Sequence, residues 1–284
     1  MINLIAFLDG SQYSKSVCDH AAWIAEKVGG SVSLVHALGR RDESKTPVDL
    51  SGSIGLGART ALLEELAQLD GQSARLAHKL GRAILEDARE ILQTAGVKQV
   101  STLLRNDGIV EMVQAFEDEA DLIIIGKRGE GTQSDEMHLV SNFDSVVRSS
   151  HKPILVASRE FKPIKRCLIA FDGGVSALKA VDYLARTPVY NDIECRLLSV
   201  SGSRGSVLQS LEKAESKLRD AGYRVEVTVQ AGDVEAVIGE TIRAGQVDLL
   251  LMGAYGHSRI RNFIIGSTTT AMIRSCKVPV LLFR

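Results

Sequence analysis

The chain has 284 residues, of which 45% are hydrophobic and 24% charged, and its formal net charge is −1 at pH 7. This composition is typical of a soluble globular protein, and the length suggests two domains. The balanced charge argues against nucleic acid as the main partner, because neutralising a phosphate backbone requires a basic surface. No transmembrane helix is expected, since no uncharged apolar stretch reaches about 18 residues.

The N-terminal sequence MINLIAFLDGS is interpreted as a strand and not as a signal peptide, because it lacks a basic segment and reaches an acid at Asp9. The four cysteines are scattered, and no two have the spacing of a metal site or a redox motif: Cys18, Cys167, Cys195 and Cys276. We interpret them as buried free thiols, which predicts a cytoplasmic protein, and we expect no metal site.

The sequence contains an internal repeat. ADLIIIGKRGEG at 120–131 matches VDLLLMGAYGHS at 247–258, with the paired residues 127 positions apart. VVRSSHKPILV at 146–156 matches MIRSCKVPVLL at 272–282. The chain is therefore expected to consist of two copies of one structural unit.

The first copy is the longer one. IAFLDGS at its start resembles LIAFDGG in the second copy, which pairs Asp9 with Asp172 at a separation of 163 residues. Because the separation falls to 127 at the glycine loop, the first copy carries a net insertion of 36 residues, mostly within 37–80. The joint lies in the polar segment SREFKPIKR, so domains are expected at 1–158 and 165–284.

The insertion has two parts. A Gly/Ser-rich stretch at 51–58 is interpreted as a loop, and the segment from about 59 to 93 as a helix. Its apolar residues follow helical spacing: Leu62, Leu66, Leu69, Leu76, Leu80 and Ile84. A lid over the first copy's crevice is one interpretation, and an extended surface or dimer-contact helix is the favoured one.

Strands and helices alternate in the second copy. Strands are expected at 167–171, 195–200, 224–229, 248–252 and 278–283, and helices at 175–186, 205–221, 233–244 and about 266–275. Short, continuous apolar runs such as DLLLM are typical of parallel strands buried on both faces. The predicted fold is α/β, with two tandem doubly wound domains, each a five-stranded, mainly parallel sheet with helices on both faces. Ligands of such sheets bind outside the carboxyl ends of the strands.

A glycine motif follows one of these strand ends. Gly253 and Gly256 come directly after the strand that ends at Met252, and Gly266 with Ser267 opens the next helix. Glycines let a backbone approach phosphate oxygens closely, and the free amides of a helix N-terminus favour an anion. The motif therefore predicts a phosphate site, to which Thr268 adds a second hydroxyl. Ser267 as a simple N-cap is the alternative.

The first copy lacks part of this motif. Gly126 and Gly129 are retained, but Val140 stands where Gly266 stands. Its loop also carries three acids, Glu130, Asp135 and Glu136. A Cβ at the start of the helix and nearby carboxylates both disfavour a polyphosphate. The first crevice is therefore expected to be degenerate for nucleotide, and we expect Gly266→Val to abolish nucleotide binding in the second copy without disturbing the fold.

The pattern G-x2-G-x9-G-[S/T] resembles the nucleotide-binding signature of the universal stress protein family. The strand-end Asp172 and the length of each copy fit the family as well, and the resemblance covers the whole chain. It implies two tandem domains of the Rossmann-like, adenine nucleotide alpha hydrolase-like fold. It further implies a UspA-like stress-response protein that binds ATP, with or without Mg²⁺.

The resemblance also implies roles for individual residues. Asp172 corresponds to the residue that contacts the adenine, although it could instead cap the following helix. The base pocket would be lined by Ala170, Val200 and Met252. The ribose and phosphates would lie on Gly253, Gly256, Gly266, Ser267 and Thr268, with His257 and Arg259 as further phosphate donors or as solvated side chains. The equivalents in the first copy are Asp9, Val35, Ile125, Gly126, Gly129, Val140, Ser141 and Asn142.

Three functional hypotheses follow. The chain could be a nucleotide-binding regulator, a slow ATPase, or a stress scaffold in which nucleotide is incidental. No Walker-type loop occurs, and His257 is the one titratable candidate base in the second glycine loop, so no catalytic residue is assigned. Gly266 and Ser267 favour the first two hypotheses, and the missing base favours the regulator.

The last strand of each copy bears on partners. KPILVAS and VPVLLFR are apolar and lie near a sheet edge, and exposed edges pair with other strands. In the family these strands pair domain with domain, so the two copies are expected to pair within one chain. A homodimer is a further possibility, with the inserted helix as the candidate surface.

Overall fold

The computed structural model describes residues 2–39, 56–127, 145–190, 192–200, 207–254 and 266–284. The first half contains β1 (Asn3–Leu8), α1 (Ser14–Val28), β2 (Ser31–Ala37), α2 (Leu56–Thr94), β3 (Val100–Arg105), α3 (Ile109–Phe116), η1 (Glu117–Glu119), β4 (Leu122–Gly126) and β5 (Ile154–Ala157). The second half contains β6 (Arg166–Ala170), α5 (Val175–Arg186), η2 (Pro188–Tyr190), β7 (Glu194–Val200), α6 (Leu208–Asp220), β8 (Val225–Gln230), α7 (Val234–Thr241), η3 (Ile242–Gln246), β9 (Leu249–Gly253), α8 (Ser267–Ser275) and β10 (Val280–Phe283).

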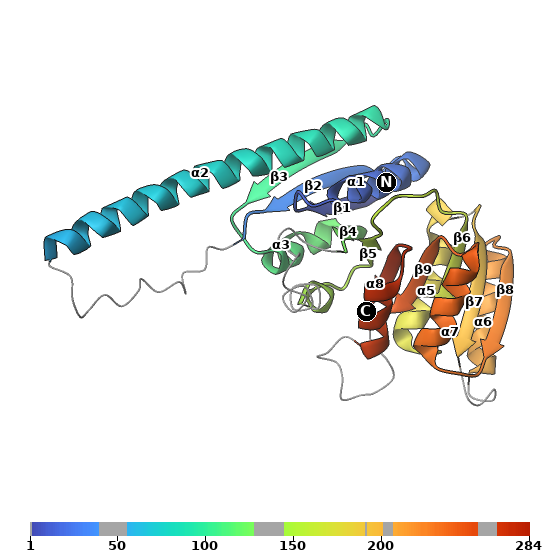
Figure 1. Cartoon of the computed structure of the whole chain (residues 1–284). Helices are drawn as coiled ribbons and strands as arrows, with labels where there is room; N and C mark the ends of the chain where they lie inside the picture. The colour runs from blue at the N-terminus through green and yellow to red at the C-terminus, as the bar shows by residue number, and fades with distance from the viewer. Residues whose placement is uncertain (1, 40–55, 128–144, 191, 201–206, 255–265) are drawn as a thin grey trace.

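All ten of these strands join one sheet, in the order β3-β2-β1-β4-β5-β10-β9-β6-β7-β8 (Figure 1). Within each half the neighbouring strands run parallel, with the chain crossing between them through helices. Each half is thus a five-stranded doubly wound sheet, which confirms the predicted fold class. The strands are short apolar runs, such as the wholly buried Leu249–Met252 portion of β9, as expected where helices cover both faces.

The two halves meet where β5 and β10 pair. These last strands run antiparallel, with Leu155 opposite Leu281 and Val156 opposite Val280. Because the strands within each half are parallel and the junction is antiparallel, all strands of one half point opposite to those of the other. The carboxyl ends of the two halves therefore lie at opposite edges of the sheet, and so do the crevices expected there.

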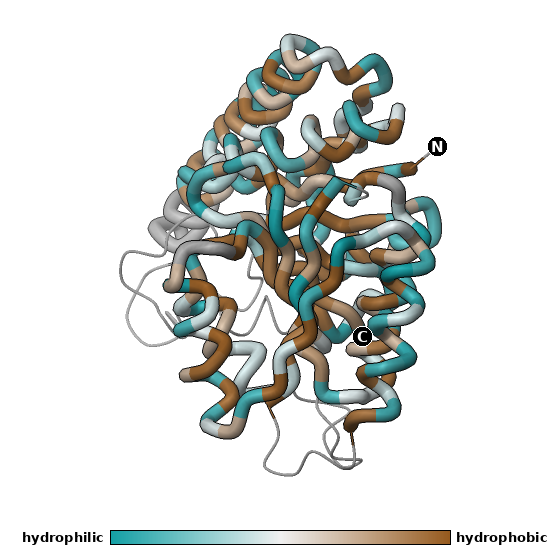
Figure 2. The backbone as a smooth tube through the Cα atoms, turned by 90° about the vertical axis from the view of Figure 1, so that its right-hand side faces the viewer, coloured by the Kyte–Doolittle hydropathy of each residue, from teal (hydrophilic) through white to brown (hydrophobic). Residues whose placement is uncertain are grey.

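The core consists of two apolar layers, one on each face of the sheet. One layer joins the sheet to α1, α2, α5 and α6, and the other joins it to α3, α7, α8 and the helical residues 145–149. Each layer includes residues from both halves and continues across the junction, where Leu155 and Leu281 belong to the first layer. Figure 2 shows the apolar segments gathered in the centre of the body.

The observed elements match the predicted ones closely in the second half, with end points shifted by one to three residues. Two differences stand out. The helix predicted from about 59 begins at Leu56, so the end of the stretch interpreted as a loop is helical. The helix predicted at 233–244 ends at Thr241 and continues as a π-helical turn, η3.

All four cysteines are free and buried, as predicted. Among the described helices, none is long and apolar enough to cross a membrane.

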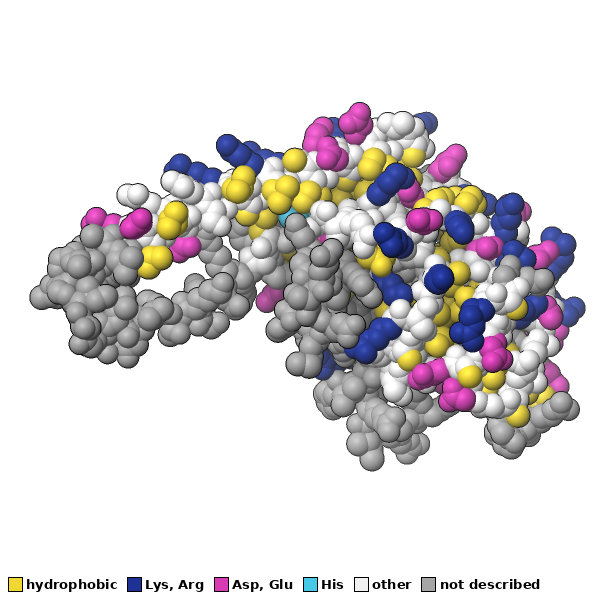
Figure 3. All heavy atoms as spheres, in the orientation of Figure 1, with side chains coloured by type: hydrophobic (Ala, Val, Ile, Leu, Met, Phe, Trp, Pro, Cys, Tyr) yellow, Lys and Arg dark blue, Asp and Glu magenta, His cyan; other side chains and the backbone are white. Residues whose placement is uncertain are grey.

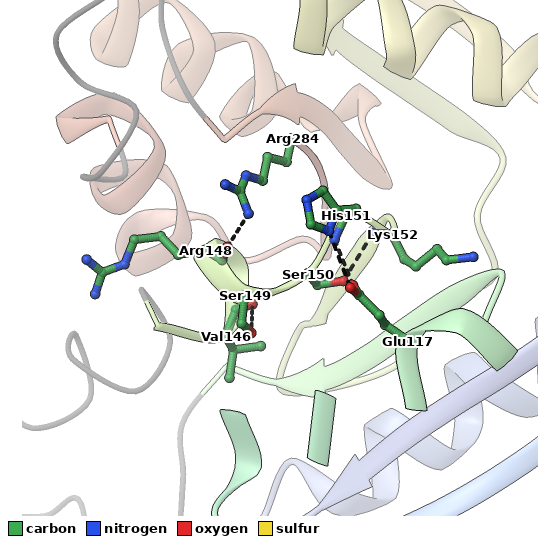
Figure 4. Close-up of polar contacts among 8 residues, drawn as sticks. All are labelled: Glu117, Val146, Arg148, Ser149, Ser150, His151, Lys152 and Arg284. Atoms are coloured by element: carbon green, nitrogen blue, oxygen red, sulfur yellow. Dashed lines mark hydrogen bonds and ion pairs between the residues drawn. The ribbon is translucent and has the colours of Figure 1, made fainter. Parts of the chain in front are cut away.

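Polar contacts fix the segments that lie next to the junction (Figure 4). Arg284, the last residue of the second half, donates to the backbone carbonyl of Arg148 in the first half. The His151 amide donates to the Glu117 carboxylate at 2.8 Å just before β5 begins. Burial works to raise the pKa of Glu117, but its hydrogen bonds from His151 outweigh this and hold the pKa below the ordinary value. The turn into β5 is therefore fixed by an ionised carboxylate.

Helix α1 packs against the linker between the halves. His20 of α1 is fully buried, meets the ring of Phe161 edge-on at a centroid distance of 4.9 Å, and binds the Ser16 carbonyl through Nδ1 at 2.7 Å. Its Nε2 has no hydrogen-bond partner among the described residues. Burial lowers the pKa of His20, against the opposing effects of the Ser16 carbonyl and the Asp19 charge.

His20 is expected to make the fold acid-sensitive. Because the native state keeps the imidazole neutral, unfolding takes up a proton below about pH 6.5, and the free energy of unfolding then falls by at most about 1.4 kcal/mol per pH unit, until the lowered native pKa is reached. His20→Leu removes this contribution. Denaturant unfolding of both proteins from about pH 7 to about pH 5 checks this. The free energy of unfolding of the wild type, relative to that of His20→Leu, should fall as the pH falls, whereas parallel curves would contradict the account.

Candidate functional site

The candidate site lies at the carboxyl edge of the second half. Ala170 ends β6, Val200 ends β7 and Gly253 ends β9. The strand register sets Ala170 beside Met252 on one side and beside Leu198 on the other, two residues before Val200. The structure therefore brings the residues predicted to line a base pocket to the ends of three adjacent strands.

These residues form an apolar ledge at the sheet edge. Met252 is buried, and Ala170, Val200 and Gly253 are partly exposed. Ala170 and Val200 pack against the core layer that Met252 belongs to. An apolar, partly exposed ledge next to strand-end carbonyls and amides is suited to one face of a flat ring, whose polar atoms can reach the backbone.

Helix α8 is held onto the end of β9 by two hydrogen bonds. The Gly266 amide donates to the Ala254 carbonyl at 3.2 Å. The Thr269 hydroxyl donates to the Gly253 carbonyl at 3.1 Å. These bonds place the N-terminus of α8 beside the strand ends. Thr269 was missed by the sequence analysis, although its position in the run STTT near the start of the predicted helix was a usable signal.

The N-terminus of α8 presents free backbone donors. The first intrahelical hydrogen bond runs from the Thr270 amide to the Gly266 carbonyl at 3.0 Å, so the amides of residues 267–269 precede it and have no acceptor within the helix. Ser267 is exposed, and the first turn contains no acid. The interpretation of Ser267 as the N-cap is wrong, because Gly266 is the N-cap and Ser267 is the first helical residue. Its hydroxyl can therefore serve an anion in front of the helix.

Gly266 does not need to be a glycine for its backbone conformation. Its φ is −58°, which is outside the left-handed region. A Cβ placed on it would lie 3.6 Å from Thr269 Oγ1 and 3.9 Å from the Ala254 carbonyl oxygen, which are ordinary contacts. Among the described residues, packing therefore leaves room for a side chain at this position.

Asp172 shapes the loop after β6. Its carboxylate accepts the Gly174 amide at 2.8 Å, and Gly174 is the N-cap of α5. Gly173 between them has φ of +77°, which requires glycine. The first half repeats this turn, since Asp9 accepts the Ser11 amide at 2.9 Å and Gly10 has φ of +76°. The turn before the helix is therefore common to both halves, and Asp172 forms part of this turn and does not cap α5, whose N-cap Gly174 has no side-chain cap hydrogen bond.

Several predicted residues lie outside the described part of the chain. In the second half these are Gly256, His257 and Arg259, and in the first half Gly129, Glu130, Asp135, Glu136, Val140, Ser141 and Asn142.

One predicted equivalence between residues of the two halves, that of Val35 with Val200, was wrong. Phe7 pairs with Val35 and Ala170 with Leu198, so Val35 corresponds to Leu198, and Ala37 at the end of β2 corresponds to Val200. The sequence alignment was displaced by two residues because the two strands share little sequence, SVSLVHA in β2 and ECRLLSV in β7, and no motif fixes their register.

Two segments of the chain, residues 3–158 and 163–284, match the Universal stress protein family. The chain belongs to this family. It is 35% identical over 287 residues to Universal stress protein Slr1230 from Synechocystis, with 100% of both chains covered. It is 26% identical over 74 residues to Universal stress protein MJ0577 from Methanocaldococcus jannaschii, covering 26% of this chain and 46% of that one. A solved universal stress protein from Archaeoglobus fulgidus shares the fold, with a TM-score of 0.71 at 18% identity over 99% of this chain and 96% of that chain.

In this tandem universal stress protein the carboxyl edge of the first half is built differently from that of the second. Lys127 follows β4 and Ser158 follows β5, and both line a cavity of about 550 Å³ there. The linker residues Arg159 and Glu160 line the same cavity, and the Lys127 ammonium donates to the Cys276 carbonyl of the second half at 2.7 Å. The linker and the second half thus line a cavity beside the ends of β4 and β5.

Proposed function

We propose that the second half binds an adenine nucleotide, ATP, at the carboxyl edge of its sheet, and that the chain is a stress-response regulator whose state follows nucleotide occupancy. The proposal is supported by the family, by the apolar ledge at the ends of β6, β7 and β9, and by the open N-terminus of α8 beside that ledge. A flat base and a polyphosphate require these two surfaces next to each other.

Gly266 is the observation that carries the proposal. The backbone there is compatible with any residue, and a Cβ would meet only ordinary contacts. The corresponding position of the first half is in fact Val140. Glycine is an acceptable N-cap, but neither the backbone conformation nor the contacts of the described residues require it, and we take its presence to support close approach of a ligand.

The residues are assigned to the nucleotide as follows. The base would contact Ala170, Val200 and Met252. The Asp172 carboxylate accepts the Gly174 amide through one oxygen, and other lone pairs of the carboxylate would accept from the edge of the base. The ribose and phosphates would lie against Gly253, Gly256, Gly266, Ser267 and Thr268, with His257 and Arg259 as additional donors from the loop between them. Mg²⁺ would accompany the phosphates, without a dedicated protein ligand.

The first half, residues 1–158, is proposed to be degenerate for nucleotide, unlike the second half at 165–284. Val140 and the three acids of the loop disfavour phosphate, and Arg159 and Glu160 of the linker line the cavity beside the ends of β4 and β5. A regulatory role is favoured over hydrolysis, because Asp172, the strand-end carboxylate of the site, is engaged in the turn before α5. The four free, buried cysteines fit a cytoplasmic protein.

Nucleotide release tests the proposal. We expect the purified chain to liberate adenine nucleotide on denaturation, or to bind added ATP. Asp172→Ala should weaken binding by roughly tenfold, as expected for the loss of one hydrogen bond to the base and a looser turn. Chromatography of the denatured supernatant and titration calorimetry measure both. If no nucleotide is released and millimolar ATP gives no binding signal, the proposal fails.

A further inference from the structure

Helix α2 extends far beyond the body of the first half (Figure 1). It spans 39 residues, from Leu56 to Thr94, and its last turns pack on β2, β3 and α1. Over residues 64–80 nearly every side chain is exposed, with Ala74 and His78 partly covered. Because most helical stability in proteins comes from the packing of an apolar face, a second packing partner would stabilise this exposed stretch.

Two different faces of α2 are apolar. The face that packs on the body carries Leu85, Ala88 and Leu92, all buried. The second face carries the leucine stripe, Leu66, Leu69, Leu76 and Leu80, which are exposed by 47%, 56%, 68% and 50%. At 3.6 residues per turn the two faces point about a third of a turn apart. The leucine stripe is therefore not an extension of the buried face, and Figure 3 shows hydrophobic side chains along the projecting part of the helix.

The leucine stripe has the spacing of a coiled coil. Its members follow each other at intervals of three and four residues, and Ser73 occupies the one place in the row between Leu69 and Leu76. This is the a/d pattern of a heptad repeat, in which each apolar residue inserts between residues of a facing helix. A single polar residue in such a row is typical of helices that select one partner and one register.

We propose that the leucine stripe pairs with the leucine stripe of a second copy of this chain, in antiparallel orientation, so that α2 is a dimerisation helix. An antiparallel pairing centred near residue 71 sets Leu66 against Leu76 of the second copy, and Leu69 against Ser73, twice each by symmetry. The two bodies then lie at opposite ends of the paired helices, where they do not compete for space.

The charges beside the stripe select this orientation. Glu65 and Lys79 are exposed and lie on the same flank of the stripe, in the g positions of the heptads. In the antiparallel pairing Glu65 of each copy reaches Lys79 of the other, which gives two ion pairs against the single like-charge contact of Asp70 with Asp70 of the second copy. In a parallel pairing Glu65 would instead lie next to Asp70 of the second copy, which is a like-charge contact. Charge complementarity thus favours a second copy, antiparallel, as the occupant of the stripe.

The full chain tests the proposal by sedimentation equilibrium from micromolar to millimolar concentration. We expect the mass to approach twice 30.7 kDa. Leu69→Glu should raise the dimer dissociation constant at least tenfold, because a carboxylate would be buried between the helices. Gln68→Glu adds the same charge to the neighbouring exposed position off the stripe and should leave it unchanged. A monomeric wild type, or equal effects of the two variants, would overturn the proposal.

A charge exchange tests the orientation. Glu65→Lys and Lys79→Glu should each weaken self-association, since each creates two like-charge pairs. Mixing the two variants should restore dimers, because every pair in the mixed dimer is again of opposite charge. Both variants keep exposed positions and leave the fold intact, as circular dichroism can verify. If Glu65→Lys strengthens self-association, the helices are parallel and the antiparallel proposal is wrong.

Discussion

Replacing Gly266 by valine is expected to weaken nucleotide binding by the second half by roughly tenfold to a hundredfold, the equivalent of one charge-assisted hydrogen bond of about 1.5–3 kcal/mol. The valine side chain would occupy the open space in front of α8 and keep a phosphate away from the amides of residues 267–269. The fold should persist, because φ at this position is −58°. The loss of unfolding free energy should stay at about 1 kcal/mol, since valine is a poorer N-cap than glycine.

Binding is measured by calorimetric titration with ATP, and stability by denaturant unfolding. Ser275→Val serves as the control, because Ser275 lies at the other end of α8 and its exposed hydroxyl donates to the Ala271 carbonyl. The control should bind as the wild type does. Unchanged ATP affinity in Gly266→Val would remove the main support for a phosphate site at α8.

Leu281→Ala is expected to lower the free energy of unfolding by about 2–5 kcal/mol, the usual loss for a fully buried leucine. Leu281 has no exposed surface and lies in β10 opposite Leu155 of β5. The cavity would thus form where the two halves share one core layer. Because a single domain is stable by only about 5–15 kcal/mol, such a loss is a large fraction of the total.

The fluorescence of Trp23 reports this effect from the first half. Trp23 is the single tryptophan of the chain and lies on α1, with its ring 6.2 Å from that of Tyr190 in the second half. Unfolding followed by Trp23 should therefore shift in Leu281→Ala, although the substitution is in the second half. Leu178→Ala on α5, where the side chain is 40% exposed, is the matched control and should lose less than about 1 kcal/mol. A Trp23 transition that Leu281→Ala leaves unmoved would mean that the junction does not couple the halves.

The repeat made most of the fold predictable from the sequence. Two copies of a strand and helix alternation predict a parallel sheet covered by helices in each half, since short apolar runs between helices are typical of such a sheet. The Asp-Gly turns after β1 and β6 were visible as a matching pair, Asp9 and Asp172. Only end points changed, notably at Leu56, where helix formation continues into a stretch whose glycines had suggested a loop.

The site was predicted less completely because part of it depends on contacts across the sequence. The tether from Thr269 to the Gly253 carbonyl joins residues from two elements and leaves no periodic signal. The equivalence of Ala37 and Val200 became clear only from the strand register. Leucine spacing predicted the helix in the insertion, but its projection from the body is a tertiary feature, which shows in the exposure of Leu69 and Leu76.

The stoichiometry of ATP binding by the full chain is the most direct test of nucleotide binding by the second half alone. Calorimetric titration of the wild-type protein and of Gly266→Val at equal concentration gives it. We predict one ATP per chain for the wild type and roughly tenfold to hundredfold weaker binding for the variant, as expected for the loss of one charge-assisted hydrogen bond. Two sites per chain, no site, or one site whose affinity Gly266→Val leaves unchanged would each contradict the assignment of the nucleotide to the ends of β6, β7 and β9 and the N-terminus of α8.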